Sequence, residues 1–207
     1  DLHFLDIHNL LVVRGDPPKA NKLFKPENNG HAYASELLTQ IMDMNKGTYL
    51  DDELENTTAT KFSVGVAGYP EKHIEAPNLD TDIHYLKEKI AAGAEYIVTQ
   101  MFFDNKKYFD FVDICRSQGI EVPIIPGLKP IVRKSDLQLL PKTFNIDIPK
   151  ELSSEILKCK TDKEVYELGI QWCIAQSKEL KTHQVPALHY FTIGIADNIL
   201  SIAKEIF

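Results

Sequence analysis

The stretch from Val64 to Gln100 constrains the fold of this chain most strongly. An apolar run, Phe62–Ala67, stops at Gly68-Tyr69-Pro70. A short run that is rich in β-branched residues and closed by Gly and Pro is typical of a buried strand. Residues 86–94 carry an apolar stripe at helical spacing, and a second apolar strand is predicted from Tyr96 to Thr99, ending on Gln100. This order predicts a parallel α/β unit, which places its chemistry in the loop after the strand.

The same alternation of strand and helix recurs along the whole chain. Further strands are predicted at Leu10–Val13, Val122–Ile125 and Leu188–Ile193, and helices at His31–Met44, Lys106–Ser117, Arg133–Leu140, Lys150–Lys158, Asp162–Leu180 and Asn198–Phe207. Residues 46–61 are too polar for a core and predict a surface excursion or a short helix. Five strand–helix units without a hairpin predict a parallel sheet with right-handed crossovers.

Two α/β architectures fit these five units. One is an open doubly wound sheet, and the other is the last five βα units of a (β/α)8 TIM barrel. No GxGxxG or P-loop glycine motif follows any predicted strand, which weighs against a dinucleotide-binding Rossmann domain. The chain also begins without Met, on residues typical of the end of a helix. We therefore favour a barrel whose N-terminal strands lie outside this chain.

Composition and charge exclude several classes of protein. The 207 residues are 43% hydrophobic and 26% charged, which suits one soluble globular domain. The formal net charge of −7 argues against binding of nucleic acid. No apolar run approaches the roughly 20 residues that a membrane helix needs.

Cysteines and acidic residues give no sign of a metal site. The three cysteines, Cys115, Cys159 and Cys173, have no metal-ligand spacing. They predict reduced structural thiols and a cytoplasmic protein. The acidic run at residues 51–55 has no histidine beside it and is typical of a solvated face.

Polar residues gather where the predicted strands end and helices begin. Arg14, Gly15 and Asp16 follow the first strand, although such a short motif is more often a solvated turn. Tyr33, Ala34 and Ser35 are predicted in the first turn of a helix, where free backbone N–H groups favour a phosphate. Asp82 and Lys89 stand two helical turns apart, so both lie on one face of their helix.

Several segments together resemble the methylenetetrahydrofolate reductase family. They are LLVVRGDPP, HAYASELL, GVAGYPEKHIEAPN, LKEKIAAGAEYIVTQMFFDN, VPIIPGLKPI and LHYFTIG, which occur in the family's order and span nearly the whole chain. The resemblance implies a flavoprotein (β/α)8 barrel that reduces 5,10-methylenetetrahydrofolate to 5-methyltetrahydrofolate, with FAD passing a hydride from NAD(P)H. It also implies that residues 1–207 belong to a single catalytic barrel domain and that its first three strands, with the family's general-acid glutamate, precede this chain.

The resemblance assigns roles to individual residues. It implies FAD contacts for Arg14, Gly15, Asp16, Tyr33, Ala34, Ser35, Ala67, Tyr69, His73, Asp82 and Lys89, a catalytic role for Asp16, and folate contacts for Gln100 and Phe191. Phe191, Ile193, Gly194 and Ile195 depart from the family, which commonly has a Tyr followed by Leu-Asn-Arg at the last strand.

The resemblance leaves two alternative functions to be separated by experiment. One is a barrel enzyme that binds an anionic ligand without flavin, and the other is a non-catalytic flavin-binding barrel. For the reductase we expect methylenetetrahydrofolate and NAD(P)H as partners, a homo-oligomer, no membrane or nucleic-acid partner, and no metal.

Overall fold

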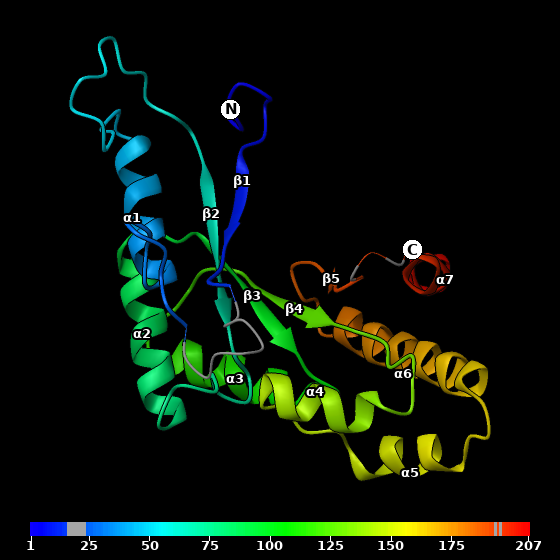
Figure 1. Ribbon diagram of the computed structural model, residues 1–207. Helices are drawn as coiled ribbons and strands as arrows, with labels where there is room; N and C mark the ends of the chain where they lie inside the picture. Colours follow the sequence, from blue (N-terminus) through cyan, green and yellow to red (C-terminus); the bar gives the residue numbers. More distant parts are fainter. Residues whose placement is uncertain (16–23, 193, 195) are drawn as a thin grey trace. The chain divides into compact units, whose positions relative to one another are not determined.

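A computed structural model describes residues 1–15, 24–192, 194 and 196–207. In these residues, five strands alternate with helices (Figure 1). The strands are β1 (Asn9–Val12), β2 (Ser63–Gly68), β3 (Tyr96–Met101), β4 (Ile124–Leu128) and β5 (His189–Tyr190). The helices are α1 (Ala34–Met44), α2 (Leu79–Ala91), α3 (Asn105–Ser117), α4 (Asp136–Phe144), α5 (Lys150–Lys158), α6 (Asp162–Thr182) and α7 (Asp197–Ile206).

The five strands form one sheet in the order β1-β2-β3-β4-β5. β1 pairs in parallel with β2, with Leu11 opposite Gly65, and β4 pairs in parallel with β5, with Gly127 opposite His189. A doubly wound sheet reverses its strand order at a switch point, whereas a (β/α)8 barrel adds each strand beside the one before it. The α/β architecture is therefore compatible with part of a TIM barrel, and the number of units in the complete barrel stays a prediction.

The chain divides into two compact units. The first unit comprises Asp1–Ala67 and His84–Ile97, and the second unit comprises Gly68–Ile83 and Val98–Phe207. The prediction of one catalytic domain over residues 1–207 stays a prediction. No helix that the described residues form is long and apolar enough to cross a membrane.

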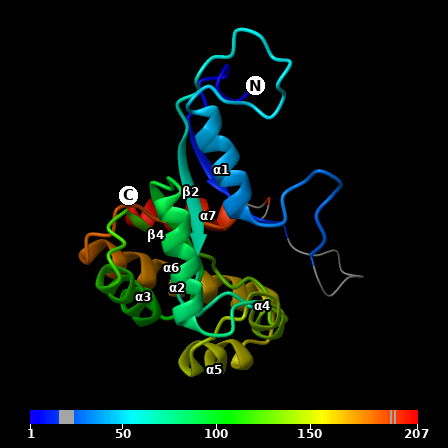
Figure 2. The ribbon, with the colours of Figure 1, turned by 90° about the vertical axis from the view of Figure 1, so that its left-hand side faces the viewer.

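In the first unit, α1 lies beside the parallel pair β1 and β2 (Figures 1 and 2). The ring of Tyr96 occupies the place of a side chain at Gly65, because a Cβ there would lie 2.1 Å from the ring. The Tyr96 hydroxyl donates to the Leu10 carbonyl at 2.8 Å. At the end of α1, Asn45 accepts from the Phe62 N–H at 2.9 Å and donates to the Phe62 carbonyl at 2.8 Å, which fixes where β2 begins.

In the second unit, an apolar core forms between the end of β3 and helices α4 to α6. Its buried members are Met101, Phe103, Ile131, Leu140, Ile146, Leu152, Ile156 and Val165. The indole N–H of Trp172 donates to the Phe103 carbonyl at 3.0 Å, and the Gln176 amide donates to the Phe102 carbonyl at 3.3 Å. These bonds pair the carbonyls that follow β3, so α6 fixes the path of the chain there.

The bounds that we predicted for β4 from the sequence are wrong. We expected a strand at Val122–Ile125 that Pro126 and Gly127 would end, but β4 continues through both to Leu128. A side chain at Gly127 would meet the Thr99 carbonyl at 2.1 Å, and the Gly127 N–H donates to the Thr99 hydroxyl at 2.9 Å. The glycine is therefore the site of a close backbone approach within the sheet rather than a turn signal.

Other elements also differ from the prediction in their bounds, among them α4, which spans Asp136–Phe144 rather than Arg133–Leu140. β3 extends to Met101, so Gln100 lies within the strand. β5 comprises His189 and Tyr190 among the described residues, a much shorter strand than the predicted one. α1 begins at Ala34 rather than His31. The Glu36 carboxylate accepts the N–H groups of Ala32 and Tyr33, the two residues before the helix, and the backbone of Tyr33 is extended.

We predict that Gly169→Ala destabilises the complete protein by about 1–3 kcal/mol, the usual cost of overpacking. In most helices the same change is favourable by roughly 1 kcal/mol. Here a Cβ would lie 1.9 Å from the Ile131 carbonyl oxygen, which belongs to the backbone and cannot rotate away. Urea unfolding measures the difference, with Gln171→Ala on the exposed face of α6 as the matched control. A stabilised Gly169→Ala protein would contradict the close approach of α6 to Ile131.

Candidate functional site

The residues predicted to bind ligands fall into both units. The first unit holds Arg14, Gly15, Tyr33, Ala34, Ser35, Ala67 and Lys89. The second unit holds Tyr69, His73, Asp82, Gln100 and Phe191. Asp16, the predicted catalytic residue, lies outside the described residues, as do Ile193 and Ile195.

Arg14 holds a positive charge near the start of α1. It follows β1, and its guanidinium carbon lies 5.0 Å from the ring centroid of Phe24 and 5.8 Å from that of Tyr33. Tyr33 is the residue before the first turn of α1. Cation–π contacts of this kind hold a guanidinium in place, and a guanidinium carries five N–H donors of the kind that bind phosphate oxygens. A helix N-terminus also favours negative charge. The first unit therefore has suitable donors for a phosphate.

Glu36 occupies part of the same helix start. Its carboxylate accepts from the Ala32 N–H at 2.6 Å and from the Tyr33 N–H at 3.3 Å. Our expectation of free N–H groups in this turn was therefore too broad, because those of residues 32 and 33 are bonded to the chain's own carboxylate. A phosphate here would rely on Arg14 and on the N–H groups of Ala34 and Ser35.

The structure brings together Lys89 and Ala67, two of the predicted cofactor residues. The Lys89 ammonium reaches from α2 to the end of β2 and donates to the Ala67 carbonyl at 3.1 Å. Lys89 is half-buried, so it is not a wholly solvated helix lysine. The ammonium thus lies at the carboxyl end of a strand, where parallel α/β folds bind their ligands.

In the second unit, residues 69–76 form a tightly bonded loop after β2, which we name the 69–76 loop. The rings of Tyr69 and His73 meet edge to face, with centroids 4.7 Å apart. The His73 N–H donates to the Asp82 carboxylate at 2.8 Å, and the Glu75 N–H donates to His73 Nδ1 at 3.2 Å. Asp82 therefore ties the loop to the first turn of α2.

Lys72 adopts a strained backbone conformation within this loop. Its φ is 79°, in the left-handed region that costs a non-glycine residue roughly 1–2 kcal/mol. The Lys72 N–H donates to the Tyr69 carbonyl at 3.1 Å, and its ammonium donates to the Ala76 carbonyl at 2.7 Å. These bonds offset the strain and close the loop on itself.

Gln100 and Phe191 take defined positions in the second unit. The Gln100 side-chain oxygen accepts from the Met101 N–H at 2.9 Å, so the amino group of the same carboxamide is the part available as a donor to a ligand. The Phe191 N–H donates to the Leu128 carbonyl at 2.9 Å. Its ring meets that of His189 edge to face at 4.8 Å, which fixes the ring beside β4 and β5.

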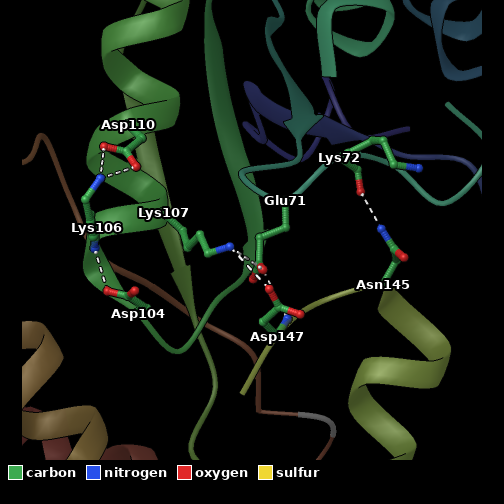
Figure 3. A network of polar contacts seen from close by, with 8 residues as sticks. All are labelled: Glu71, Lys72, Asp104, Lys106, Lys107, Asp110, Asn145 and Asp147. Atoms are coloured by element: carbon green, nitrogen blue, oxygen red, sulfur yellow. Dashed lines mark hydrogen bonds and ion pairs between the residues drawn. The ribbon is translucent and has the colours of Figure 1, made fainter. Parts of the chain in front are cut away.

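Sequence reasoning missed a group of charged residues around Glu71, shown in Figure 3. Glu71 stands in the 69–76 loop and contacts Lys107 of α3 and Asp147 between α4 and α5. The partners lie up to 76 residues away along the chain. The one local signal was a carboxylate directly after a buried strand and Pro70, and that pattern is shared with many solvated turns.

Two of the cysteines are unsuited to nucleophilic chemistry. Cys115 and Cys173 are buried, and burial raises the pKa of each thiol to about 12. Both therefore remain protonated at neutral pH, when only the thiolate is a strong nucleophile. The described residues contain no group of three or more His, Cys, Asp or Glu side chains that could hold a metal ion.

Comparison with known proteins identifies a family. The model of the methylenetetrahydrofolate reductase family matches residues 2–206. The chain is 35% identical over 202 residues to methylenetetrahydrofolate reductase 2 of Saccharomyces cerevisiae, covering 96% of this chain and 32% of that protein.

Two further relatives come from a plant and a bacterium. The chain is 34% identical over 210 residues to methylenetetrahydrofolate reductase (NADH) 1 of Arabidopsis thaliana, covering 97% of this chain and 33% of that protein. It is 31% identical over 201 residues to 5,10-methylenetetrahydrofolate reductase of Escherichia coli, covering 97% and 61%. The chain thus spans about a third of the length of the yeast and plant relatives.

We predict that Asp82→Ala speeds hydrogen exchange at the His73 amide about tenfold, as expected for loss of a hydrogen bond of ordinary strength. Asp82→Asn should have a smaller effect, because its amide oxygen can still accept from the His73 N–H. Exchange measured by mass spectrometry on peptides covering residues 69–76 tests this. Asp80→Ala, which alters an exposed carboxylate in the same helix turn, is the control. An equal effect of the Asp80 change would show that helix charge, rather than the bond to His73, is responsible.

Proposed function

This chain belongs to the methylenetetrahydrofolate reductase family, and on that premise we propose that it serves the reduction of 5,10-methylenetetrahydrofolate to 5-methyltetrahydrofolate. The observation that carries the proposal is the family match over residues 2–206, nearly the full length of the chain. The activity is proposed for the complete protein to which the chain belongs. A homo-oligomer, a cytoplasmic location and NAD(P)H as the electron donor are part of the same proposal.

We further propose FAD as the cofactor. Bound FAD would supply the hydride carrier between NAD(P)H and the folate. The fit of the first unit rests on Arg14, whose guanidinium is held by two aromatic rings near the start of α1 and can donate to a phosphate. The neighbouring residues of the proposed set are Gly15, Tyr33, Ala34 and Ser35. Lys89 adds a second cation at the end of β2, beside Ala67.

The second unit offers groups of a different kind. Tyr69 and His73 present an aromatic pair, which suits the planar and apolar parts of a cofactor. Asp82 already accepts the His73 N–H, so we assign it two roles: holding the 69–76 loop and accepting from cofactor hydroxyl groups. A carboxylate has lone pairs for more than one donor.

Gln100 and Phe191 are proposed to contact the folate. The Gln100 amide is oriented by the Met101 N–H, and its amino group can donate to an acceptor on the pterin. The Phe191 ring offers a face for stacking. Asp16 is proposed as the catalytic residue of this chain, because an anion beside the folate stabilises the positive charge that develops when the methylene bridge opens to an iminium.

The complete protein, purified without added flavin, tests this function. Heat denaturation should release FAD rather than FMN, identified by chromatography. NAD(P)H should bleach the flavin absorption, and methylenetetrahydrofolate should restore it. A colourless protein that still binds an anionic ligand would favour the non-flavin enzyme. Bound flavin that NAD(P)H cannot bleach would favour the non-catalytic barrel.

We predict that Gln100→Glu weakens methylenetetrahydrofolate binding by about 1–3 kcal/mol, the penalty for leaving a polar group unpaired, or roughly ten- to a hundredfold in affinity. A glutamate keeps the shape and can still accept from the Met101 N–H, but an acceptor replaces the outward amino donor. Reduction of the flavin by NAD(P)H should stay largely intact. Stopped-flow measurement of the two half-reactions separates the effects.

Gln171→Glu introduces the same change of charge on an exposed part of α6 and serves as the control. Equal slowing of both half-reactions by Gln100→Glu would contradict a pterin contact and indicate that Gln100 supports the flavin instead.

A further inference from the structure

Glu71 carries a buried carboxyl group in the 69–76 loop, where the nearby Glu75 is exposed. Its side chain is 7% exposed, whereas that of its neighbour Asp147 is 79% exposed. The Asp147 N–H donates to Glu71 Oε2 at 3.1 Å. The Lys107 ammonium lies 3.5 Å from the same oxygen and 3.2 Å from Asp147 Oδ2, as the dashed lines in Figure 3 indicate. Three segments of the second unit thus converge on one carboxyl group.

The second carboxyl oxygen of Glu71 has a different environment. Oε1 is buried, and within the described part of the chain it has no hydrogen-bond partner. A cavity of about 420 Å³ adjoins the group, lined by Glu71, Lys107, Pro141, Asn145, Ile146 and Asp147. A buried acceptor without a donor is unfavourable, and a carboxylate more so than a neutral acid. The site therefore favours a protonated Glu71.

These contacts join the 69–76 loop to the segment between α4 and α5. Asn145, which ends α4 in a left-handed conformation, donates from its side chain to the Lys72 carbonyl at 3.5 Å, beside the bond from Asp147 to Glu71. At its other side the loop is held by the bond from the His73 N–H to Asp82. In the sequence of the loop, Glu71 stands between Tyr69 and His73, the two residues whose rings meet edge to face.

We propose that Glu71 is a positioning residue, whose buried carboxyl group fastens the 69–76 loop to Asp147 and Lys107 and thereby holds the Tyr69 and His73 rings in their binding geometry. We name these three residues the Glu71 clamp. The part of the proposal that concerns cofactor binding rests on the proposed function, because the family resemblance is what assigns Tyr69 and His73 to FAD. The clamp itself depends only on contacts within the second unit.

The clamp is sensitive to pH in the physiological range. Burial raises the pKa of Glu71 to about 7, and the carboxylate of Asp147 adds to the rise, while the Asp147 N–H and the Lys107 ammonium oppose it. Two other lysines of this network are engaged elsewhere. The Lys72 ammonium bonds to the Ala76 carbonyl, and Lys106 of α3 pairs with Asp110 (Figure 3).

The sign of the effect follows from the raised pKa. The folded protein holds the Glu71 proton up to about pH 7, whereas an unfolded chain releases it near the ordinary value of 4.5. The contribution of Glu71 to stability is therefore fully present below pH 4.5 and is lost as the pH rises to about 7. A neutral Glu71 can donate its proton to the Asp147 carboxylate. An ionised Glu71 faces that carboxylate as a second anion, so the clamp loosens at higher pH.

Hydrogen exchange of the 69–76 loop in the complete protein tests the clamp between pH 5.5 and 8.0. After correction for intrinsic rates, exchange should accelerate with a midpoint near pH 7. Glu71→Gln should give slow exchange throughout, because a neutral amide can accept from the Asp147 N–H and donate to its carboxylate. Glu71→Ala should give fast exchange throughout, about tenfold above the low-pH value, as expected for one lost hydrogen bond.

Two further variants keep the test decisive if Glu71→Ala does not fold. Lys107→Met removes the cation that favours ionised Glu71, so the midpoint should move to higher pH. Asp147→Asn removes the anion that favours protonated Glu71 and keeps the backbone N–H, so the midpoint should move to lower pH. Midpoints that do not move, or that move in the same direction in both variants, would overturn the proposal of the clamp.

Measurement of FAD affinity against pH tests the positioning role. The dissociation constant should rise about three- to tenfold across the same midpoint, an effect comparable to one hydrogen bond, and it should lose this pH dependence in Glu71→Gln. A pH-dependent loop without any change in FAD affinity would overturn the positioning role alone. A protein that binds no FAD at any pH would refute the proposed function, while the exchange data would still decide on the clamp.

Discussion

Parallel pairing of the strands is the constraint on which the candidate residues depend. Parallel strands end at the same edge of a sheet, so residues far apart in sequence meet there. In the first unit, the pairing of Val12 with Val66 brings Arg14 and Ala67 to one edge. In the second unit, the pairing of Leu128 with Tyr190 does the same for β4 and Phe191. Loss of either register would scatter these residues even if each strand still formed.

Several side chains that are proposed to contact ligands also make hydrogen bonds within the protein. Asp82 accepts the His73 N–H, Lys89 donates to the Ala67 carbonyl, and Gln100 accepts the Met101 N–H. Each bond fixes the direction of a side chain before any ligand arrives, and such preorganisation is what gives electrostatic binding groups their effect. A loss of activity after truncation of one of these side chains therefore mixes a lost contact with a moved neighbour. Replacements that keep the internal bond, such as Gln100→Glu, separate the two.

The sequence predicted the order of strands and helices, because apolar periodicity and turn residues are local signals. The prediction failed where one local signal is compatible with two different structures. Gly127 indicated a turn, but the glycine allows the Thr99 carbonyl to approach β4. The family resemblance supplied residue roles that periodicity could not, since a helix lysine such as Lys89 has the same pattern whether it faces solvent or a ligand. The partners of Glu71 could not be predicted by either route, because they depend on where α3 and the segment before α5 fold back onto the loop.

The burial of Glu71 is unfavourable in one respect, because its Oε1 atom has no hydrogen-bond partner among the described residues. A well-packed apolar side chain often matches or exceeds the stability that a buried polar group gives, and Glu75 of the same loop is exposed. What the carboxyl group provides is a fixed geometry around a strained residue. Lys72, directly after it, keeps a φ of 79°, and such a conformation persists only where its surroundings over-determine it. The bonds from Asp147, Asn145 and the Lys72 ammonium all act on this turn. The arrangement therefore favours one conformation of the loop, which is what the ligand contacts proposed for Tyr69 and His73 would require.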